Sequence, residues 1–352
     1  MNKKIITLLA MLLVQAISAF GQHIPLLNVP SPEIAGLGEY GTIPVGLFTG
    51  VPDIFVPLCE MKAGEQSFPI MASYHLASVK PQMQEGCLGI GWNLQTGGYI
   101  SRSVRGMIDE KMHSDGYAPG YYANAYRLKG MTDSQFANAT ENIRSRDGKN
   151  TYYELAADEF SFQFFGYSGT FYYNEDGGWT VISEQDIRVE FNPANGEGFI
   201  DAAGLQSRIN FGSWDMRSYN NRFFNKFTLV TPDGCRYEFG GIQATEYSIP
   251  YYQRNNSDLV ATTWQLSKIV TPDNRTITYT YEATDLMCDL KYVPQAKVVT
   301  GMACTPSNPS SGRAAMTGFL IMPVRLASIE TPNETISFSY FYDLTYGCLL
   351  YT

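Results

Sequence analysis

FTLVTPDGCRYEF, residues 227–239, is the first of three copies of one pattern in the later part of this chain. The others are LSKIVTPDNRTITYTY, residues 266–281, and LASIETPNETISFSY, residues 326–340. In each copy an apolar segment leads into Thr-Pro-Asp or Thr-Pro-Asn, and a segment rich in Ile, Phe and Tyr follows. Proline fixes φ at the second position of a turn, and Asp, Asn and Gly tolerate the positions after it. Alternating apolar residues on both sides are typical of half-buried strands, so each copy predicts a β-hairpin.

Earlier segments predict the same kind of structure. The alternating runs Ile54–Leu58 and Phe68–Tyr74 predict paired strands joined by a turn at residues 62–66, and the prolines in the first run place it at a sheet edge. Phenylalanines alternate along residues 160–164, and a turn is expected at Gly166–Gly169. We therefore expect an all-β protein of antiparallel hairpins in twisted sheets, sandwich-like in its N-terminal part, with at most one or two short helices.

The N-terminus predicts export. Lys3 and Lys4 precede an apolar run that ends in small residues, and Ala19 and Gly21 fit a signal-peptidase site that leaves Gln22 first. No later stretch approaches about 20 uninterrupted apolar residues, the length needed for a membrane span. The net charge is −9, which disfavours binding to nucleic acid or to anionic lipid. The expected location is secreted or at the outer cell surface, with no integral membrane span and no nucleic-acid partner.

Composition divides the chain into four parts. Residues 1–21 form the signal peptide, and residues 22–112 a β module containing a Gly-x-Gly-Trp block. Residues 113–150 are a polar, partly helical insert, where residues 132–134 would cap a helix that runs through Arg146. Residues 151–352 form a region of β-hairpins with turns at residues 174–178 and 192–198 and a Ser/Pro-rich solvent loop at residues 304–312.

Cysteine and histidine predict no metal site. The six cysteines lie far apart without a Cys-x-x-Cys pair, so we expect most to be free, buried, small apolar residues. The three histidines have no Cys or His partner nearby in sequence. The glycines at 86, 89 and 91 around Trp92 predict a backbone packed closely against the indole.

Four segments carry a resemblance to a known family: GTIPVGLFTG (41–50), PIMASYH (69–75), LGIGWNL (88–94) and GGYISR (97–102). They resemble the N-terminal region of secreted RHS/YD-repeat proteins. They are more distantly similar to the N-terminal region of the B component of insecticidal Tc toxins and of virulence-plasmid B proteins. DEFSF (158–162) and the Thr-Pro hairpins are similar to the continuation that leads such chains into their repeats.

The resemblance implies hairpins that join a long spiralling sheet, the start of a hollow RHS-type shell that in some members encloses a toxic C-terminal payload. Two departures from the family pattern are present. The repeated Tyr-Asp signature is absent, with Tyr279–Glu282 the nearest match, and the chain ends at Thr352, where family members continue. We therefore expect a leading fragment without payload, whose last strands expose unpaired edges.

Few residues suggest catalysis. His75 follows a predicted strand without an acid-base partner, so a packed or hydrogen-bonded structural role is expected. The pairs Asp158–Glu159 and Glu184 with Asp186 would suit a glycosidase only if their carboxyl groups lay close together. Asn174–Gly177 offers oxygen ligands for calcium but lacks the further acids of a calcium loop, so a solvated turn is expected. Most aromatic residues are expected to pack across strands.

We expect a non-catalytic module of an RHS/YD-repeat protein that serves structural encapsulation or contact with other cells. No catalytic, cofactor-binding or metal-binding residue is assigned. The expected partner is the missing C-terminal repeats of the same polypeptide, another cell-surface protein, or a glycan. One alternative is a carbohydrate- or protein-binding adhesin that uses an exposed aromatic such as Trp179 or Tyr252. Another is a glycoside hydrolase, which requires a cavity with two close carboxylates.

Overall fold

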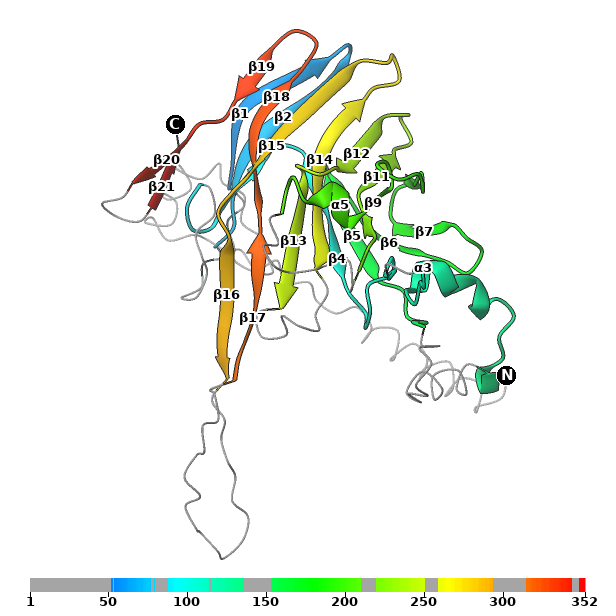
Figure 1. Ribbon diagram of the computed structural model, residues 1–352. Helices are drawn as coiled ribbons and strands as arrows, with labels where there is room; N and C mark the ends of the chain where they lie inside the picture. Colours follow the sequence, from blue (N-terminus) through cyan, green and yellow to red (C-terminus); the bar gives the residue numbers. More distant parts are fainter. Residues whose placement is uncertain are drawn as a thin grey trace, which may run out of the picture. The chain divides into compact units, whose positions relative to one another are not determined.

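The structure is a computed structural model that describes residues 52, 54–76, 79, 88–113, 116–135, 153–209, 220–250, 259–293, 315–343 and 348–351 (Figure 1). Side chains are not described at 290–293, 315–317, 341–343 and 348–351. The chain divides into two compact units, residues 1–54 and 55–352, and the described residues fall almost entirely in the second. The expected signal peptide, the helix beyond residue 135, the loop at 304–312 and Tyr252 lie outside the described residues.

The described elements are mostly short strands, which confirms the all-β fold class. The strands are β1 (Ile54–Ala63), β2 (Gln66–Tyr74), β3 (Trp92–Gln95), β4 (Gly98–Ser103), β5 (Glu159–Phe164), β6 (Tyr167–Tyr173), β7 (Trp179–Ser183), β8 (Arg188–Glu190), β9 (Phe199–Ile200), β10 (Phe223–Phe224), β11 (Lys226–Val230), β12 (Arg236–Gly240), β13 (Thr245–Pro250), β14 (Val260–Val270), β15 (Thr276–Ala283), β16 (Met287–Val293), β17 (Ala315–Met322), β18 (Val324–Glu330), β19 (Thr335–Ser337), β20 (Tyr340–Asp343) and β21 (Cys348–Tyr351).

Helical structure in the described part of the chain consists of short turns. These are α3 (Tyr121–Asn124), η2 (Ala125–Leu128), which continues from α3, and α5 (Ala202–Leu205). A further turn covers residues 133–135, where the Gln135 backbone N–H donates to Thr132 Oγ1 at 3.4 Å. The predicted cap at residue 132 is therefore present, and the described helical elements are slightly more numerous than the one or two expected.

All three predicted Thr-Pro hairpins are confirmed. They are β11–β12, β14–β15 and β18–β19, and each is antiparallel. The hairpins also pair with one another, because β12 pairs with β14 and β15 pairs with β18. Together with β8, which pairs with β11, they form one continuous run of strands in the order β8-β11-β12-β14-β15-β18-β19 (Figure 1). Each copy of the sequence pattern therefore extends the same sheet by one hairpin.

The threonine that opens each turn has a role that the sequence pattern alone did not reveal. Thr231, Thr271 and Thr331 are all buried. The Oγ1 hydroxyl of Thr271 donates to the backbone carbonyl of Arg275 at 3.2 Å, and that of Thr331 donates to the carbonyl of Glu334 at 3.1 Å. The same two carbonyls also accept from the backbone N–H groups of Thr271 and Thr331, both at 2.9 Å, and the Thr271 hydroxyl shares its single proton with Asp273 Oδ1, 2.5 Å away. Each threonine therefore ties the base of its turn through both its backbone and its side chain.

Strand β14 belongs to two runs of strands. Its first half, Val260–Gln265, pairs with β13 on one side and with β4 on the other. Its second half, Leu266–Val270, pairs with β12 and β15. The other run has the order β16-β17-β13-β14-β4-β5-β6-β7, so fourteen of the described strands form a single sheet system. A separate sheet has the order β1-β2-β3, with the proline-containing β1 at its edge as predicted.

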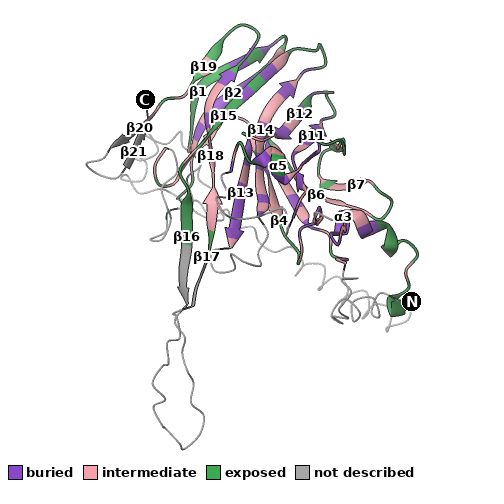
Figure 2. Cartoon of the chain, viewed as in Figure 1, coloured by how far each residue is buried: buried purple, intermediate pink, exposed green. Residues whose placement is uncertain are grey.

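The core is built from aromatic rings on facing strands. Phe160 and Phe171 are register partners on β5 and β6, and their rings stack with centroids 5.1 Å apart. Figure 2 shows buried residues gathered on β13 and β14, and Trp264 of β14 is fully buried. Trp179, proposed as an exposed aromatic, instead packs against this core, with its ring 5.3 Å from that of Phe227. Cross-strand packing, rather than display on the surface, explains these rings.

Two local predictions need correction. The β5–β6 turn is Phe165-Gly166, with φ of 40° and 84°, because Phe164 pairs with Tyr167; residues 167–169 belong to β6. Two successive positive φ values are the requirement of a two-residue type I′ hairpin turn. Gly91 has φ of 84°, and a Cβ there would lie 2.6 Å from Tyr74 Cε2. The ring of Tyr74 therefore requires glycine at this position, whereas a Cβ on Gly89 would have nothing within 4 Å and Gly86 lies outside the described residues.

Burial also departs from expectation in β1 and at two cysteines. Only the end of β1 faces the core, since Met61 and Ala63 are buried while Phe55 and Leu58 are about half exposed, at 48% and 54%. Cys59, Cys235 and Cys288 are free, as expected. Only Cys235 is buried, where burial raises the pKa of its thiol to about 12. Cys59 and Cys288 are exposed, so the expectation of buried cysteines is wrong for them.

Candidate functional site

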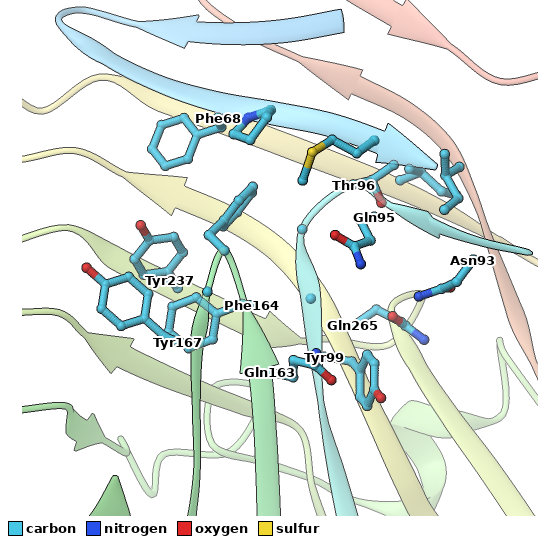
Figure 3. A pocket seen from close by; sticks show the side chains of 18 of the residues that line it. Phe68, Asn93, Gln95, Thr96, Tyr99, Gln163, Phe164, Tyr167, Tyr237 and Gln265 are labelled. Carbon is cyan, nitrogen blue, oxygen red and sulfur yellow. The ribbon is translucent and has the colours of Figure 1, made fainter. Parts of the chain in front are cut away.

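A cavity of about 760 Å³ lies where the β1-β2-β3 sheet meets the large sheet (Figure 3). We call it the amide pocket, because five Asn and Gln side chains line it. Its lining residues are 66–69, 71, 93–99, 163–167, 233, 237, 265, 281, 324–326 and 340. Three of the segments that carry the family resemblance, around residues 69–75, 88–94 and 97–102, contribute to this lining.

One wall of the pocket is the corner at which the chain passes from β3 to β4. A Cβ on Gly97 would lie 2.7 Å from Leu266 Cδ2, and a Cβ on Gly98 would lie 2.2 Å from the backbone oxygen of Gln163. Only glycine permits such an approach. The Tyr279 hydroxyl donates to the carbonyl of Thr96 at 2.9 Å and holds the corner in place. The GGY sequence thereby fixes the position of Tyr99, which lines the pocket.

The amide side chains differ in how far they are already engaged. Gln95 Nε2 donates to Ser73 Oγ at 3.0 Å, and Gln265 Nε2 donates to Glu246 Oε1 at 3.4 Å. The side chains of Gln66, Asn93 and Gln163, by contrast, make no hydrogen bond within the described part of the chain. A primary amide carries both donors and an acceptor, so these three can bind a ligand that offers either.

Aromatic rings also line the pocket. Phe68 and Phe165 meet edge to face with centroids 5.2 Å apart, and Phe164 lies 4.6 Å from the buried Tyr237. Burial raises the pKa of Tyr237, which therefore stays protonated and neutral. Tyr99 is 40% exposed and lies beside Gln163 in the pocket lining (Figure 3).

The two charged residues that line the pocket are both engaged. Arg325 Nη2 forms an ion pair with Glu282 Oε2 at 2.9 Å. Asp233 accepts a hydrogen bond from the hydroxyl of Thr231 and another from the backbone N–H of Cys235. Burial alone would raise the pKa of Asp233, but these hydrogen bonds outweigh it and lower the pKa. Asp233 is thus an ionised turn residue, which is unsuited to donate a proton as a general acid.

A second feature is a cluster of charges buried beneath β4 and β5, which we call the Arg102 cluster: Arg102, Asp109, Glu110 and Asp158. The side chains of Arg102, Glu110 and Asp158 have no exposed surface. Arg102 binds Glu110 through Nη1 at 2.9 Å and Nη2 at 2.5 Å, and it binds Asp158 through Nε at 2.8 Å and Nη2 at 2.5 Å. One guanidinium therefore neutralises two carboxylates: it binds both oxygens of Glu110 and directs two N–H groups at Oδ2 of Asp158.

The cluster joins segments that are distant in sequence. Asp158 Oδ1 accepts from the backbone N–H of Arg105 at 2.7 Å, and Glu110 Oε1 accepts from that of Phe224 at 3.3 Å. Asp109 and Asp158 each donate a backbone N–H to the carboxylate of the other, at 3.1 and 3.0 Å. None of the three carboxylates lines the amide pocket or a second cavity, which is lined by Glu246. The arrangement is that of a structural lock.

Asp109 is the member of the Arg102 cluster in an electrostatically unfavourable position. Its Oδ2 is buried without a partner, and burial together with repulsion from Asp158 raises its pKa well above the usual range. A raised pKa in the folded state means that its contribution to stability is present below the unfolded pKa and is lost as pH rises through the folded pKa. We expect Asp109→Asn to raise the free energy of unfolding by about 1–3 kcal/mol at pH 7.5 and to change it little near pH 4.

The measurement is urea denaturation of the unchanged protein and of Asp109→Asn between pH 4 and pH 8. Asp158→Asn serves as the control, because it removes a carboxylate that Arg102 binds directly, and it should destabilise the protein at pH 7.5. Parallel curves for Asp109→Asn and the unchanged protein would show that Asp109 carries no unfavourable charge.

A second cavity, of about 750 Å³, contains one carboxylate. Its lining includes Glu246, Ser248, Thr262 and Thr263. Burial raises the pKa of Glu246, whose Oε1 accepts from the backbone N–H of Val324 at 3.3 Å. A glycosidase requires a second carboxyl group about 5–9.5 Å away. The described residues that line this cavity offer none, and those that line the amide pocket offer only Asp233.

The structure separates the carboxylates that the sequence placed in pairs. Asp158 is buried in the Arg102 cluster, whereas Glu159 is on the outside and pairs with Arg105. Glu184 and Asp186 are exposed in the connection between β7 and β8 and line neither cavity. Neither pair therefore has the setting of a catalytic site.

The two remaining candidates from the sequence, His75 and the turn at Asn174–Gly177, make hydrogen bonds that hold the backbone in place. His75 directly follows β2, is exposed, and donates its backbone N–H to the carbonyl of Gly91 at 2.8 Å. Asn174 Oδ1 accepts from the backbone N–H groups of Asp176 and Gly178, at 3.1 and 2.9 Å. The predicted turn is confirmed, and its asparagine oxygen is occupied by the turn itself rather than directed at a cation.

Sequence analysis missed Arg102, Asp109 and Glu110 and did not single out the amides. Arg102 and Asp158 are 56 positions apart, and no spacing rule connects them. The one local signal was the Asp109-Glu110 dipeptide, which reads as an exposed loop until the strands on either side are placed. Within the described ranges no group of three or more His, Cys, Asp and Glu residues is arranged to hold a metal.

Comparison with known proteins finds distant structural likeness. No protein-family model and no curated protein matches the sequence. The crystal structure of TcdB2-TccC3-TEV aligns over 85% of this chain, with 12% identity and a TM-score of 0.34, and the chain spans only 11% of that one. The N-terminal domain of the effector protein SpvB from Salmonella typhimurium strain LT2 aligns over 85% of this chain and 69% of its own, with 11% identity and a TM-score of 0.28.

The chain is thus distantly similar to the Tc-toxin and virulence-plasmid B proteins that its sequence resembles. Among the described helices, none is long and apolar enough to cross a bilayer.

Proposed function

We propose that this chain is an exported, non-catalytic β module of an RHS/YD-repeat protein and that its hairpins form part of a shell used for encapsulation or for contact with another cell. The observation that carries the proposal is the strand order β11-β12-β14-β15-β18-β19, in which each Thr-Pro hairpin is added beside the previous one. A sheet that grows by one hairpin for each copy of a pattern is suited to enclosing a volume by repetition.

The edge of the sheet supports the same proposal. Among the described strands β19 pairs only with β18, so its other edge is open to a further strand. Open edges favour pairing with another chain unless they are covered. We propose that additional hairpins, from the same polypeptide or from a partner, complete the sheet at this edge.

Isolating the native polypeptide that carries this sequence, from the culture fluid and from the cell envelope, tests the proposal. We expect it in the exported fractions, and we expect cryo-electron microscopy to find a further strand beside β19. Retention in the cytoplasm, or a particle in which no further strand pairs with β19, would contradict the proposal.

Catalysis is the remaining alternative. Its candidate residue is Glu246, because this is the one carboxylate among the described residues that line the second cavity and because its pKa is raised by burial. We expect no turnover of chromogenic glycosides above that of heat-denatured protein. A hydrolytic activity that Glu246→Gln abolishes and Glu184→Gln preserves would replace the shell proposal with an enzyme.

A further inference from the structure

We propose that the amide pocket binds a neutral oligosaccharide, with its side-chain amides bonded to sugar hydroxyls and its aromatic rings packed on the faces of the sugar. The proposal goes beyond a shell role and does not depend on it. It rests on the chemistry of the lining, on the absence of an unpaired charge there, and on the size of the cavity.

The polar chemistry of the pocket matches hydroxyl groups. A sugar hydroxyl both donates and accepts, and each primary amide does the same from two neighbouring atoms. Gln66, Asn93 and Gln163 line the pocket without a hydrogen bond to the described chain. Ligand sites commonly combine apolar walls with a few polar groups that set orientation, and these three amides would have that role.

The aromatic partner lies directly beside one of these amides. Tyr99 on β4 and Gln163 on β5 are opposite one another in the antiparallel register. Figure 3 shows both side chains on the same side of the pocket. Opposite residues in a ladder lie about 4.5–5.5 Å apart at Cβ, so a flat ring and an amide are presented side by side. A sugar has the matching features, because its C–H face is apolar while its rim carries hydroxyls.

The charges of the pocket argue against an anionic ligand. Among the described lining residues Arg325 is the one cation; its Nη2 pairs with Glu282, the guanidinium lies over the ring of Tyr340, 4.9 Å from the centroid, and its Nε is buried without a partner. A phosphate, sulfate or carboxylate would therefore meet a guanidinium whose charge is already paired with Glu282, not the free cation that such ligands normally require. The ionised Asp233 would repel them further.

The size and shape of the pocket select among neutral ligands. Its volume of about 760 Å³ lies within the range of roughly 300–1,000 Å³ that is usual for small-molecule sites. An extended peptide is the rival occupant, because β3 is at the edge of its sheet and borders the pocket. Strand β3 has only four residues, however, and offers few backbone groups for strand addition.

The test is calorimetric titration of the purified protein with cello-, malto-, manno- and chito-oligosaccharides of two to four sugars. Oligogalacturonates serve as acidic sugars, and a library of uncharged decapeptides represents the peptide rival. We expect at least one neutral oligosaccharide to bind. The variant Tyr99→Ala and the double variant Asn93→Ala/Gln163→Ala should each weaken that binding at least tenfold.

Matched controls separate the pocket from the rest of the surface. Tyr126→Ala removes a tyrosine that is 62% exposed and outside the pocket, and Gln243→Ala removes an exposed amide outside it. Both should bind within twofold of the unchanged protein, and all variants should keep its thermal midpoint. The proposal is overturned if no neutral oligosaccharide binds, if the acidic sugars bind more tightly, if the pocket variants bind normally, or if a peptide binds in the pocket instead. None of these results bears on whether the chain is exported or extended at β19.

Discussion

Replacing Arg102 by methionine is expected to lower the free energy of unfolding by about 3–5 kcal/mol at neutral pH, the usual cost of breaking a buried ion pair from one side. Burial alone would lower the pKa of this guanidinium, but the attraction of Glu110 and Asp158 outweighs burial and raises it. Methionine preserves much of the side-chain volume and removes the charge. Two carboxylates then remain buried without their shared partner. Urea denaturation monitored by circular dichroism measures this loss in free energy of unfolding.

The matched control is Arg105→Met, three positions further along the chain. Arg105 pairs with Glu159, and both side chains are well exposed, at 58% and 39%. An exposed pair contributes less than about 1 kcal/mol, so this variant should unfold almost normally. Equal losses for the two variants would mean that the Arg102 cluster does not act as a buried lock.

The pH dependence of the Arg102→Met variant provides a second check. Burial already raises the pKa of Asp158 in the unchanged protein, and without the guanidinium the attraction of Arg102 no longer opposes that rise. Carboxyl groups of that kind stabilise the fold below their unfolded pKa and lose the contribution as pH rises through the folded pKa. The loss in free energy of unfolding that Arg102→Met causes should therefore become smaller toward pH 4. The triple variant with Glu110→Gln and Asp158→Asn should recover part of the loss at pH 7.5, because no unpaired charge is left.

The hairpins were predictable because their signals are local. Proline, the following Asp or Asn, and the alternating apolar residues all lie within about 15 positions, so the turn and both strands of each copy could be placed from sequence. The same signals gave the fold class. They failed at the β5–β6 turn, which is Phe165-Gly166, because the nearby Ser168 and Gly169 suggested a later turn.

The order of the hairpins and the candidate site could not be predicted, because both depend on long-range pairing. β14 pairs with β4, about 160 positions earlier, and that pairing places Gln265 opposite Tyr99. The amide pocket is assembled from segments that span residues 66 to 340. Amides give no spacing signal of their own, since an exposed Gln on a strand looks the same in sequence whether it faces solvent or a cavity. Only the register distinguishes the two cases.

Trp264→Ala is expected to cost about 3–5 kcal/mol, the usual range for truncating a fully buried aromatic residue. Trp264 has no exposed surface, its ring lies 5.3 Å from that of Phe227, and its Nε1–H donates to the carbonyl of Phe224 at 3.1 Å. Trp264→Phe is the matched control. It keeps a ring in the core but leaves that carbonyl without its donor, so the expected cost is smaller, about 1–3 kcal/mol.

The position of Trp264 makes the form of the unfolding transition as informative as its midpoint. This residue is in the half of β14 that pairs with β13 and β4, while the other half pairs with β12 and β15. A strand shared in this way should couple the Thr-Pro hairpins to the β4–β7 strands, so that both are lost together. We expect Trp264→Ala to unfold in a single transition with an unchanged dependence on urea concentration. Two separate transitions would show that the hairpin run and the β4–β7 run are independent cooperative units. The two runs would then share β14 but unfold independently.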